Sequence, residues 1–321
     1  MKKTILITGG SGFIGSHLIE ELLKKNDYKI IVLSRSEFNN DRLIPFSKKI
    51  EQIFIDKTPL EKVFKSQKID AILHLATMYV KNHQKSEEVE AMIDANVRFP
   101  AVLCDLASRY GVKFFVNSGS FFEYDLNKKK KIKESDRLSP YNFYSATKRS
   151  VSEILKYYAE SSDMKVVDFR LFAPFGENDN EKLIQLLIKS LLNNNELDFS
   201  GGEQRWNYTY VKDIVKAYIL ATEHMEEIKS NYLPINVGYD KVTSIRNIAR
   251  ILENISGKKL KIKWGAKPYI ENEIFYVNCD NSRLKDILHW EPDFDLKSGL
   301  KRTFNYYLEK ENNALKKIKS A

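Results

Sequence analysis

The chain has few of the residues that mark several classes of protein. Its 321 residues include 2 cysteines, 13 glycines and 8 prolines. Cys104 and Cys279 cannot build a disulfide framework, and they do not stand in a Cys-x-x-Cys metal spacing. The low glycine and proline contents exclude collagen-like and linker-rich chains. No stretch approaches the roughly eighteen consecutive apolar residues of a membrane-spanning helix.

A long apolar segment is also missing from the start of the sequence. The opening MKKTILITGG has a basic pair but only a short apolar run before two glycines, whereas a signal peptide needs a longer one. We therefore expect a cytoplasmic protein with no membrane partner. Hydrophobic residues make up 43% and charged residues 30%, a balance typical of globular proteins. The length suits one domain with a smaller lobe.

Charge is the unusual part of the composition, with a formal net charge of +9. Lysines concentrate in residues 128–133 and 315–320. No aromatic side chains alternate with these lysines, as a single-stranded nucleic-acid site requires. We therefore expect a lysine-rich surface and no nucleic-acid partner.

The spacing of apolar residues predicts alternating strands and helices. The expected strands are residues 3–8, 29–33, 52–55, 71–75, 112–117 and 165–171, and the expected helices are 13–25, 87–110 and 144–160. This alternation predicts an α/β fold of the Rossmann type, a doubly wound parallel sheet with a smaller α/β substrate lobe. We expect residues 1–172 to form the dinucleotide-binding domain, with segments near 207–237 returning to it. Residues 173–321 should form mainly the substrate lobe.

A glycine-rich segment, residues 8–15, lies between the first expected strand and the first expected helix. Gly9 permits a tight turn, Gly12 lets the backbone approach a pyrophosphate, and Gly15 lets the helix pack closely on the strand. Free N–H groups at the helix N-terminus then face the phosphates. The segment predicts a dinucleotide site made by Gly9, Ser11, Gly12, Phe13, Ile14 and Gly15.

The end of the second expected strand indicates which dinucleotide is bound. Sites that prefer NAD usually carry an acidic residue there, which bonds the adenosine ribose. This chain has Ser34, Arg35 and Ser36 instead. The planar guanidinium of Arg35 suits a 2′-phosphate, and the two hydroxyls add donors. We therefore expect NADP(H) to be favoured, with NAD(H) possible.

Tyr144 and Lys148 form a Tyr-x-x-x-Lys pair on an expected helix. Residues four apart share one helix face, so the phenol and the ammonium group are neighbours. A nearby cation favours the phenolate and lowers the pKa of a tyrosine, which makes Tyr144 a candidate proton donor or acceptor. Ser120 follows the strand expected at 112–117, at the edge where parallel sheets bind ligands. We expect Ser120 to hydrogen-bond the oxygen that Tyr144 protonates.

These segments together resemble the extended short-chain dehydrogenase/reductases of the nucleotide-sugar epimerase/dehydratase family. The resemblance covers nearly the whole chain, through TGGSGFIG at 8–15, LHLAT at 73–77, YSATK at 144–148, RLFAPFG at 170–176 and GEQRWNYTYVKD at 202–213. It implies a catalytic set of Ser120, Tyr144 and Lys148, with Asn96 helping to position the lysine. It also implies cofactor contacts from Asp56, Leu75, Ala76, Thr77 and Pro174, and substrate contacts from Met78, Tyr79, Ser120 and Arg205, of which Arg205 would grip the diphosphate of a nucleotide sugar.

Three reactions compete within that family: 4,6-dehydration, 4-epimerisation and 4-keto reduction. The dehydratases carry an Asp-Glu pair directly after the catalytic Ser or Thr, whereas this chain has Phe121 and Phe122, with Glu123 one place late. Residues 120–122, 202–204 and 272–274 resemble the 4-ketoreductases of the CDP-abequose synthase type. No arginine stands in 267–273, where many relatives hold the diphosphate, so the nucleotide stays open.

The resemblance thus implies NADPH-dependent reduction of the C4 keto group of a nucleotide-linked 4-keto-6-deoxy or 3,6-dideoxy hexose, for surface polysaccharide synthesis. An NAD-dependent nucleotide-sugar 4-epimerase is the alternative, and a non-catalytic NADP-sensing regulator is a remote one. The family pairs the two long helices into a dimer interface, so a homodimer is expected. His17 and His74 have no second ligand at metal spacing, and we expect no metal site.

Overall fold

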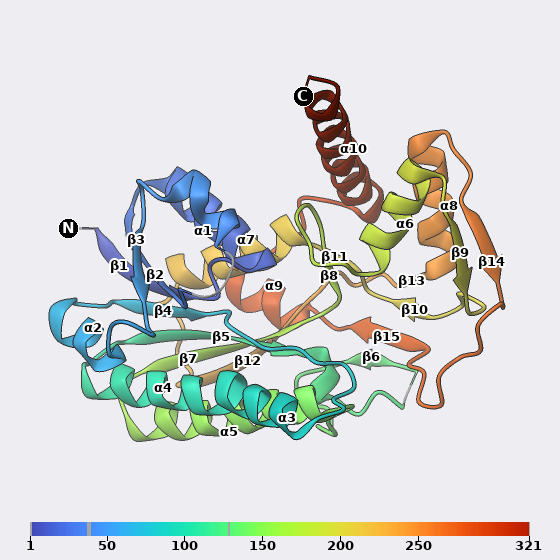
Figure 1. The fold of residues 1–321 in the computed structure, drawn as a ribbon. Helices are drawn as coiled ribbons and strands as arrows, with labels where there is room; N and C mark the ends of the chain where they lie inside the picture. The colour runs from blue at the N-terminus through green and yellow to red at the C-terminus, as the bar shows by residue number, and fades with distance from the viewer. Residues whose placement is uncertain (1, 37–39, 128, 321) are drawn as a thin grey trace.

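A parallel sheet of seven strands forms the centre of the computed structural model, which describes residues 2–36, 40–127 and 129–320. Its order is β12-β7-β5-β4-β1-β2-β3, and every neighbouring pair is parallel. The arrangement confirms the predicted α/β fold class (Figure 1). The strands are β1 (Lys3–Thr8), β2 (Tyr28–Ser34), β3 (Glu51–Phe54), β4 (Ala71–His74), β5 (Phe114–Ser120), β7 (Lys165–Leu171) and β12 (Tyr232–Val237).

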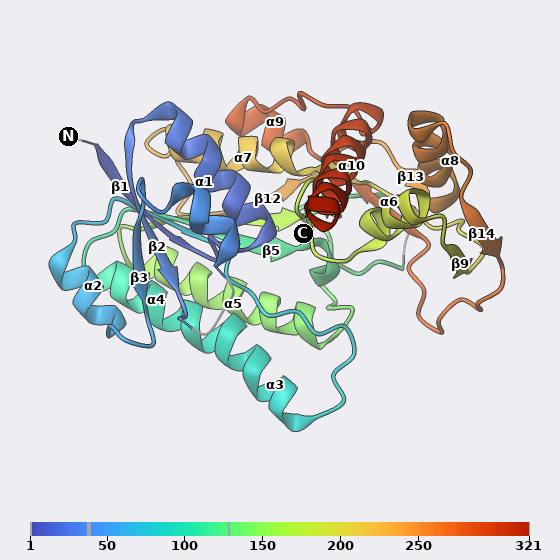
Figure 2. The same ribbon diagram turned by 45° about the horizontal axis from the view of Figure 1, so that its top comes forward.

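Helices cover both faces of this sheet because its strands are apolar on both sides. Ile5 and Ile7 of β1 belong to the core beneath one set of helices, whereas Leu6 between them belongs to the core on the other face. The first set is α1 (Phe13–Lys25), α7 (Val211–Glu223) and α9 (Ser282–Leu288), and the second is α2 (Leu60–Ser66), α4 (Phe99–Arg109) and α5 (Phe143–Ser161). Figure 2 shows α1 and α7 on the opposite side of the sheet from α4 and α5.

The strand order reverses at β1, which lies between β2 and β4. The chain leaves β1 toward β2 on one side and later returns to β4 on the other, so a crevice opens at the carboxyl ends of these strands. Gly9 follows β1, Leu75 follows β4, and Ser120 is the last residue of β5. The fold therefore collects the predicted site residues along one edge of the sheet.

The helix expected over 87–110 contains a bulge. Helix α3 (Ser86–Ile93) passes into a π-helical turn, η2 (Asp94–Arg98), before α4 begins. Pro100 has no N–H for the carbonyl of residue 96, so the regular hydrogen-bond ladder is interrupted there. The bulge places Asn96 in the interior, where it is almost fully buried.

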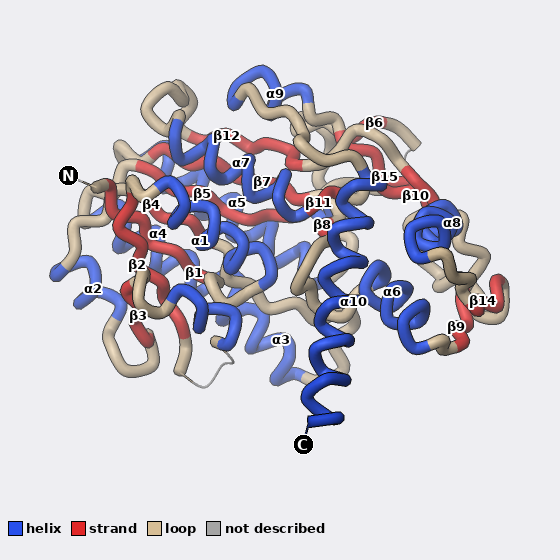
Figure 3. The backbone as a smooth tube through the Cα atoms, turned by 90° about the horizontal axis from the view of Figure 1, so that it is seen from above, coloured by secondary structure: helices blue, strands red, loops and turns tan. Residues whose placement is uncertain are grey.

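Smaller elements lie beyond the carboxyl edge of the main sheet. Strands β13, β10, β15 and β6 form a four-stranded sheet, and β11-β8 and β14-β9 form two pairs. Figure 3 shows α8, β9 and β14 together at the end of the molecule away from β2 and β3. The bounds are β6 (Lys131–Ile132), β8 (Pro174–Phe175), β9 (Glu196–Phe199), β10 (Arg205–Trp206), β11 (Thr209–Tyr210), β13 (Thr243–Ser244), β14 (Lys261–Trp264), β15 (Tyr276–Cys279), α6 (Leu183–Asn193), α8 (Ile245–Ser256), α10 (Leu296–Ser320), η1 (Asp41–Phe46) and η3 (Phe121–Glu123).

The lysine runs occupy different surroundings. Lys128 lies outside the described residues, whereas Lys130 pairs with Asp136 at 2.5 Å and Lys131 begins β6. The run at 315–320 belongs to the last turns of α10. Among the helices that the structure describes, none is long and apolar enough to span a bilayer.

Candidate active site

The glycine-rich segment turns between β1 and α1 in a shape that side chains would block. Gly9 has φ +71°, and a Cβ there would lie 2.5 Å from the Ala76 nitrogen. A Cβ at Gly15 would overlap the Gly9 carbonyl oxygen. Gly12 donates its N–H to the same oxygen at 2.9 Å, and a Cβ on Gly12 would meet that oxygen alone, at 3.0 Å. Backbone atoms therefore pack directly against Gly9 and Gly15, whereas the space beside the Gly12 Cα is largely open.

This turn suits the pyrophosphate of a dinucleotide. The first turn of α1 contains no acidic residue, and no side chain caps its N-terminus. Its free N–H groups and positive dipole end therefore face the space above Gly12. Arg42, on η1, donates to the Ser11 carbonyl at 3.1 Å and to the Asn178 carbonyl at 3.0 Å. Arg42 could not be singled out from the sequence, because no motif surrounds it.

The end of β2 carries a cation and a carboxylate together. Ser34 is buried at the strand end, and Arg35 and Ser36 are exposed beyond it. The Ser36 N–H donates to Asp56 at 3.0 Å, and its hydroxyl donates to the other carboxylate oxygen. These two hydrogen bonds lower the pKa of Asp56. The structure thus brings three predicted cofactor residues and Asp56 to one place, with groups for a ribose and for a phosphate.

Ser120 and the Tyr144–Lys148 pair meet where α5 packs against β5 and η3. Asn142 caps α5 by accepting the Ser145 N–H at 3.0 Å, which starts the helix immediately before Tyr144. The Lys148 Nζ lies 5.9 Å from the centre of the Tyr144 ring. Ser120 and Lys148 are both buried. The helical spacing therefore places the phenol and the ammonium group side by side on α5, and their catalytic role with Ser120 stays a prediction.

Burial controls the charge of both groups on α5. It raises the pKa of Tyr144 above its ordinary value, so the prediction that Lys148 lowers this pKa is wrong for the chain by itself. Burial also lowers the pKa of Lys148 to about 8, against the opposing charges of Glu123 and Asp168. Near neutral pH, Tyr144 is therefore a phenol and Lys148 largely an ammonium ion.

Asn96 fixes the chain that leaves β4. Its side-chain NH2 donates to the Met78 carbonyl at 2.8 Å and to the Thr147 hydroxyl at 3.0 Å. Its carbonyl oxygen accepts the Met78 N–H at 2.7 Å and the Thr77 hydroxyl at 3.1 Å. Asn96 thus reaches the residue before Lys148 rather than Lys148 itself. The bulge at η2 is what turns it inward, and π-bulges frequently occur at functional sites.

The remaining predicted cofactor residues line the same edge. The Leu75 N–H donates to the Thr8 carbonyl at 3.1 Å, and the Ala76 N–H donates to the Thr8 hydroxyl at 3.2 Å, which places them beside the glycine turn. Pro174 lies in β8, paired with Thr209. Tyr79 is 51% exposed and lies edge-on to Tyr144, with ring centres 4.8 Å apart.

Strand β10 presents one of its two side chains to the residues that follow Ser120. The Trp206 ring lies edge-on to Phe121, with centres 5.5 Å apart, and to Phe122, with centres 6.1 Å apart. Phe121 and Phe122 directly follow Ser120. Neighbouring side chains of a strand point to opposite faces, so the exposed Arg205 points away from these rings. The structure does not bring Arg205 to Ser120, and its contact with a diphosphate stays a prediction.

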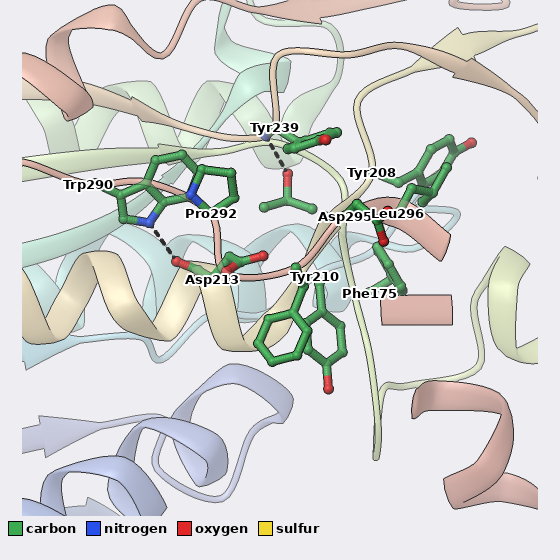
Figure 4. Close-up of a pocket in the computed structure, with 11 residues that line it drawn as sticks. Phe175, Tyr208, Tyr210, Asp213, Tyr239, Trp290, Pro292, Asp295 and Leu296 are labelled. Atoms are coloured by element: carbon green, nitrogen blue, oxygen red, sulfur yellow. Dashed lines mark hydrogen bonds between the residues drawn. The ribbon is translucent and has the colours of Figure 1, made fainter. Parts of the chain in front are cut away.

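A concave region between α7 and the segment before α10 is filled by its own side chains. Figure 4 shows the Trp290 indole, which donates to the Asp213 carbonyl at 2.9 Å, and the Tyr239 N–H, which donates to the Thr209 hydroxyl at 3.1 Å. The lining leaves no room for a water molecule, so this region joins elements rather than binding a ligand. Within the described part of the chain, no group of three His, Cys, Asp or Glu residues could hold a metal ion.

Comparison with known proteins agrees with this geometry. The model of the NAD dependent epimerase/dehydratase family matches residues 5–238. The chain is 31% identical to the CDP-abequose synthase of Salmonella typhimurium, over 94% of this chain and 97% of that protein. It resembles the UDP-glucose 4-epimerase of Thermotoga maritima, solved with UDP-glucose, with TM-score 0.84 and 26% identity over 96% and 99% of the two chains. The UDP-glucuronic acid 4-epimerase of Bacillus cereus, solved with UDP-glucuronic acid and NAD, shares the fold with TM-score 0.85 and 24% identity over 95% and 99%.

Proposed function

The chain belongs to the NAD-dependent epimerase/dehydratase family, and within it we propose an NADPH-dependent reduction of the C4 keto group of a nucleotide-linked 4-keto-6-deoxy or 3,6-dideoxy hexose. One observation carries this choice of reaction: the chain is 31% identical to CDP-abequose synthase over almost the full length of both chains. A ketoreductase starts from the phenol, which gives its proton to the new hydroxyl, whereas an epimerase starts by removing a proton from the sugar. Desolvation of the partly buried Tyr144 raises its pKa and favours the phenol, which is consistent with the same reaction.

The mechanism follows from the positions of three side chains. The bound nicotinamide supplies the hydride that C4 receives. Tyr144 donates its proton to the C4 oxygen as negative charge builds there. The Ser120 oxygen accepts the Phe122 N–H at 3.2 Å, so its own hydrogen is free to point at the same substrate oxygen. Such a fixed donor stabilises developing charge, and the Lys148 ammonium stabilises the phenolate that remains.

The cofactor proposal rests on the end of β2. Backbone N–H groups at the start of α1 would hold the pyrophosphate, and Leu75, Ala76 and Lys148 would lie along the nicotinamide half. Arg35 offers the fork that suits a 2′-phosphate, and residues 34–36 include no carboxylate to repel it. These features support NADP(H). Asp56, which bonds Ser36, supplies the acceptor that a ribose hydroxyl of NAD would use instead.

A 4-epimerase is the second candidate, and a specific observation favours it. The solved relative from Thermotoga maritima, at 26% identity, is a UDP-glucose 4-epimerase. The same Ser120, Tyr144 and Lys148 would serve that reaction, because it reduces a 4-keto intermediate in its second half. The two candidates differ in whether the cofactor is consumed.

Cofactor consumption therefore tests the proposal. The protein is mixed with NADPH and a panel of CDP-, dTDP- and GDP-linked 4-keto-6-deoxy sugars, and the NADPH absorbance is followed. In parallel, UDP-glucose and NAD are incubated with it and the products are separated. We expect NADPH to be consumed in equal amount to the keto sugar, and Tyr144→Phe to bind NADPH but to lose turnover. Interconversion of UDP-glucose and UDP-galactose without net NADPH use would establish the epimerase.

We also propose a homodimer built on α3, α4 and α5. Their outer faces carry exposed apolar side chains: Ile93 is 42%, Val102 44% and Tyr157 63% exposed. Apolar side chains on neighbouring helices form the patch that a second copy can cover. Sedimentation equilibrium of the protein and of Val102→Glu tests this, with the variant expected to be monomeric.

A further inference from the structure

A buried carboxyl group contacts Ser120, and the mechanism above gives it no role. Glu123 is the last residue of η3 and is fully buried. Its Oε1 accepts the Ser120 N–H at 2.7 Å, while the Ser120 hydroxyl oxygen accepts the Phe122 N–H at 3.2 Å. The short turn η3 therefore fixes both the backbone and the side chain of Ser120.

The backbone before Ser120 leaves space for this carboxyl group. A Cβ at Gly119 would lie 2.8 Å from Oε1 of Glu123 and 3.3 Å from Oδ1 of Asp168. Any side chain at position 119 would push against both carboxyl groups. Glycine at this position thus serves a close approach of side chains to the backbone.

The nearest cation does not neutralise Glu123 at close range. The Arg170 Nε is 3.9 Å from Oε2 of Glu123, and this Nε has no hydrogen-bond partner among the described residues. Arg170 instead donates from Nη1 to the Tyr124 hydroxyl at 2.8 Å and lies over the Tyr124 ring at 4.8 Å. A buried carboxylate without a hydrogen bond from its counter-ion is unfavourable. The negative charge of Glu123 therefore also favours the positively charged form of a second cation in its surroundings.

Glu123 and Asp168 differ in the hydrogen bonds that they accept. Asp168 accepts three hydrogen bonds of 2.7 Å, from Asn117, Ser152 and Tyr232. Glu123 accepts one bond of 2.7 Å, from the Ser120 N–H, while the Ser152 hydroxyl, 3.5 Å from its Oε2, directs its one hydrogen at Asp168. Hydrogen bonds to an ionised oxygen stabilise the charged form. Glu123 has fewer such bonds, and burial, together with the charge of Asp168, raises the pKa of Glu123 above its ordinary value.

The other cation near Glu123 is Lys148. The negative charges of Glu123 and Asp168 both favour its ammonium form, against burial, which lowers its pKa to about 8. The titratable and charged groups that face this pair are His74 on β4, Tyr124 after η3, Tyr144 on α5, and Asp168 and Arg170 on β7. Burial keeps His74 neutral and both tyrosines protonated near neutral pH. Glu123 and Lys148 are the members of this group whose pKa values shift toward neutral pH.

We propose that Glu123 is a positioning residue: its carboxylate fixes Ser120 and keeps the neighbouring Lys148 charged beside Tyr144. The kinetic consequence rests on the function proposed above, because Lys148 stabilises the phenolate that forms when Tyr144 gives up its proton. The electrostatic consequence belongs to the folded chain and needs no substrate.

The kinetic test compares three variants over a range of pH. Glu123→Gln keeps the shape and the acceptor for Ser120 but removes the charge. We expect its kcat to fall off at a pH lower by about one unit, because the variant lacks one of the two negative charges that favour the ammonium form of Lys148. Glu123→Asp keeps the charge but shortens the side chain, so its kcat should fall while the alkaline limb stays at the wild-type pH. Asp213→Asn removes another buried carboxyl group, remote from Ser120, and should leave the profile unchanged.

A second measurement separates this proposal from the proposed function. NMR of lysine labelled at Cε reports the pKa of Lys148 in the full chain without substrate, and its signal is assigned by its loss in Lys148→Met. We expect the Lys148 pKa to be at least about one unit lower in Glu123→Gln than in the wild type. An unchanged Lys148 pKa in a folded Glu123→Gln overturns the proposal, even if every sugar is turned over. A shifted pKa with no turnover of any keto sugar would leave it standing and reject the reductase.

Discussion

The two regions that meet at Ser120 are held in place by different means. On the sheet side, backbone atoms set the geometry: Gly9 and Gly15 close the turn after β1, and Asn96 bonds the backbone of Met78. On the lobe side, β10 has two residues, and aromatic contacts of Trp206 join it to η3. The sheet side therefore tolerates little change in backbone, while the lobe side depends on which side chain points inward.

The largest effect is expected on the sheet side, from Gly15→Ala. Its Cβ would overlap the Gly9 carbonyl oxygen and lie 2.9 Å from the Gly10 Cα, and backbone atoms cannot move aside as a flexible side chain can. We expect destabilisation of about 3 kcal/mol and loss of dinucleotide binding, measured by thermal unfolding and by NADPH fluorescence titration.

Gly111→Ala is the matched control for that variant. Gly111 also has φ +71°, but no atom lies within 4 Å of the Cβ that alanine would add. Only the backbone strain remains, about 1 kcal/mol, and dinucleotide binding should be unchanged. Equal NADPH affinity in Gly15→Ala and Gly111→Ala would contradict the assigned role of the turn.

On the lobe side, Trp206→Ala and Arg205→Ala should differ sharply. Trp206 packs on Phe121 and Phe122, and its indole N–H donates to the Ile274 carbonyl at 2.8 Å. Removing this half-buried ring should cost about 2–3 kcal/mol and raise the KM for the sugar nucleotide. Arg205 is exposed on the opposite face, so Arg205→Ala should change stability by less than about 0.5 kcal/mol.

Steady-state kinetics then decides the role of Arg205. If its guanidinium holds a diphosphate, Arg205→Ala raises the KM for the sugar nucleotide at least tenfold, as loss of a charge-assisted hydrogen bond does. The geometry of β10 predicts little change. A large rise in KM for Arg205→Ala together with a small one for Trp206→Ala would reverse the assignment of the two faces.

These contrasts explain how much could be predicted from the sequence. The β1–α1 turn and the Tyr144–Lys148 pair were predictable because a local spacing determines each shape. The bulge at Asn96 was not, because it depends on how Pro100 interrupts a helix that the apolar pattern continues. The inward direction of Trp206 also escaped prediction, since a two-residue strand has no alternation to read. Glu123 looked one place late in the sequence, and only the fold shows that η3 turns it back onto Ser120.

A smaller effect should follow from Arg35→Ala at the adenosine end. If Arg35 binds the 2′-phosphate, its loss weakens NADPH about tenfold, by roughly 1.5 kcal/mol for a charged hydrogen bond, and leaves NADH unchanged. Titration of both cofactors into the wild type and the variant measures this ratio. Arg250→Ala removes an exposed arginine far along the chain, on α8, and controls for the loss of one positive charge. If the ratio of NADPH affinity to NADH affinity is the same in Arg35→Ala as in the wild type, Arg35 is a surface residue that does not bind the cofactor.

A last contrast concerns acid stability, and His74 makes it a property of the sheet side. His74 is buried at the end of β4, where its Nδ1 shares a hydrogen bond of 2.7 Å with the Thr8 hydroxyl. Burial first, and then the charge of Lys148, lower the pKa of His74 from 6.5 to about 3. Below pH 6.5 the unfolded chain binds a proton at His74 that the folded chain does not, so its share of stability is lost as the pH falls toward 3. Each unit of pH in that window costs up to about 1.4 kcal/mol of unfolding free energy.

Urea unfolding at several pH values tests this. The free energy of unfolding should change less steeply with pH in His74→Gln than in the wild type, although that variant is less stable throughout. His83→Gln removes an exposed histidine and should keep the wild-type slope; the same slope in His74→Gln would mean that acid acts on the molecule elsewhere.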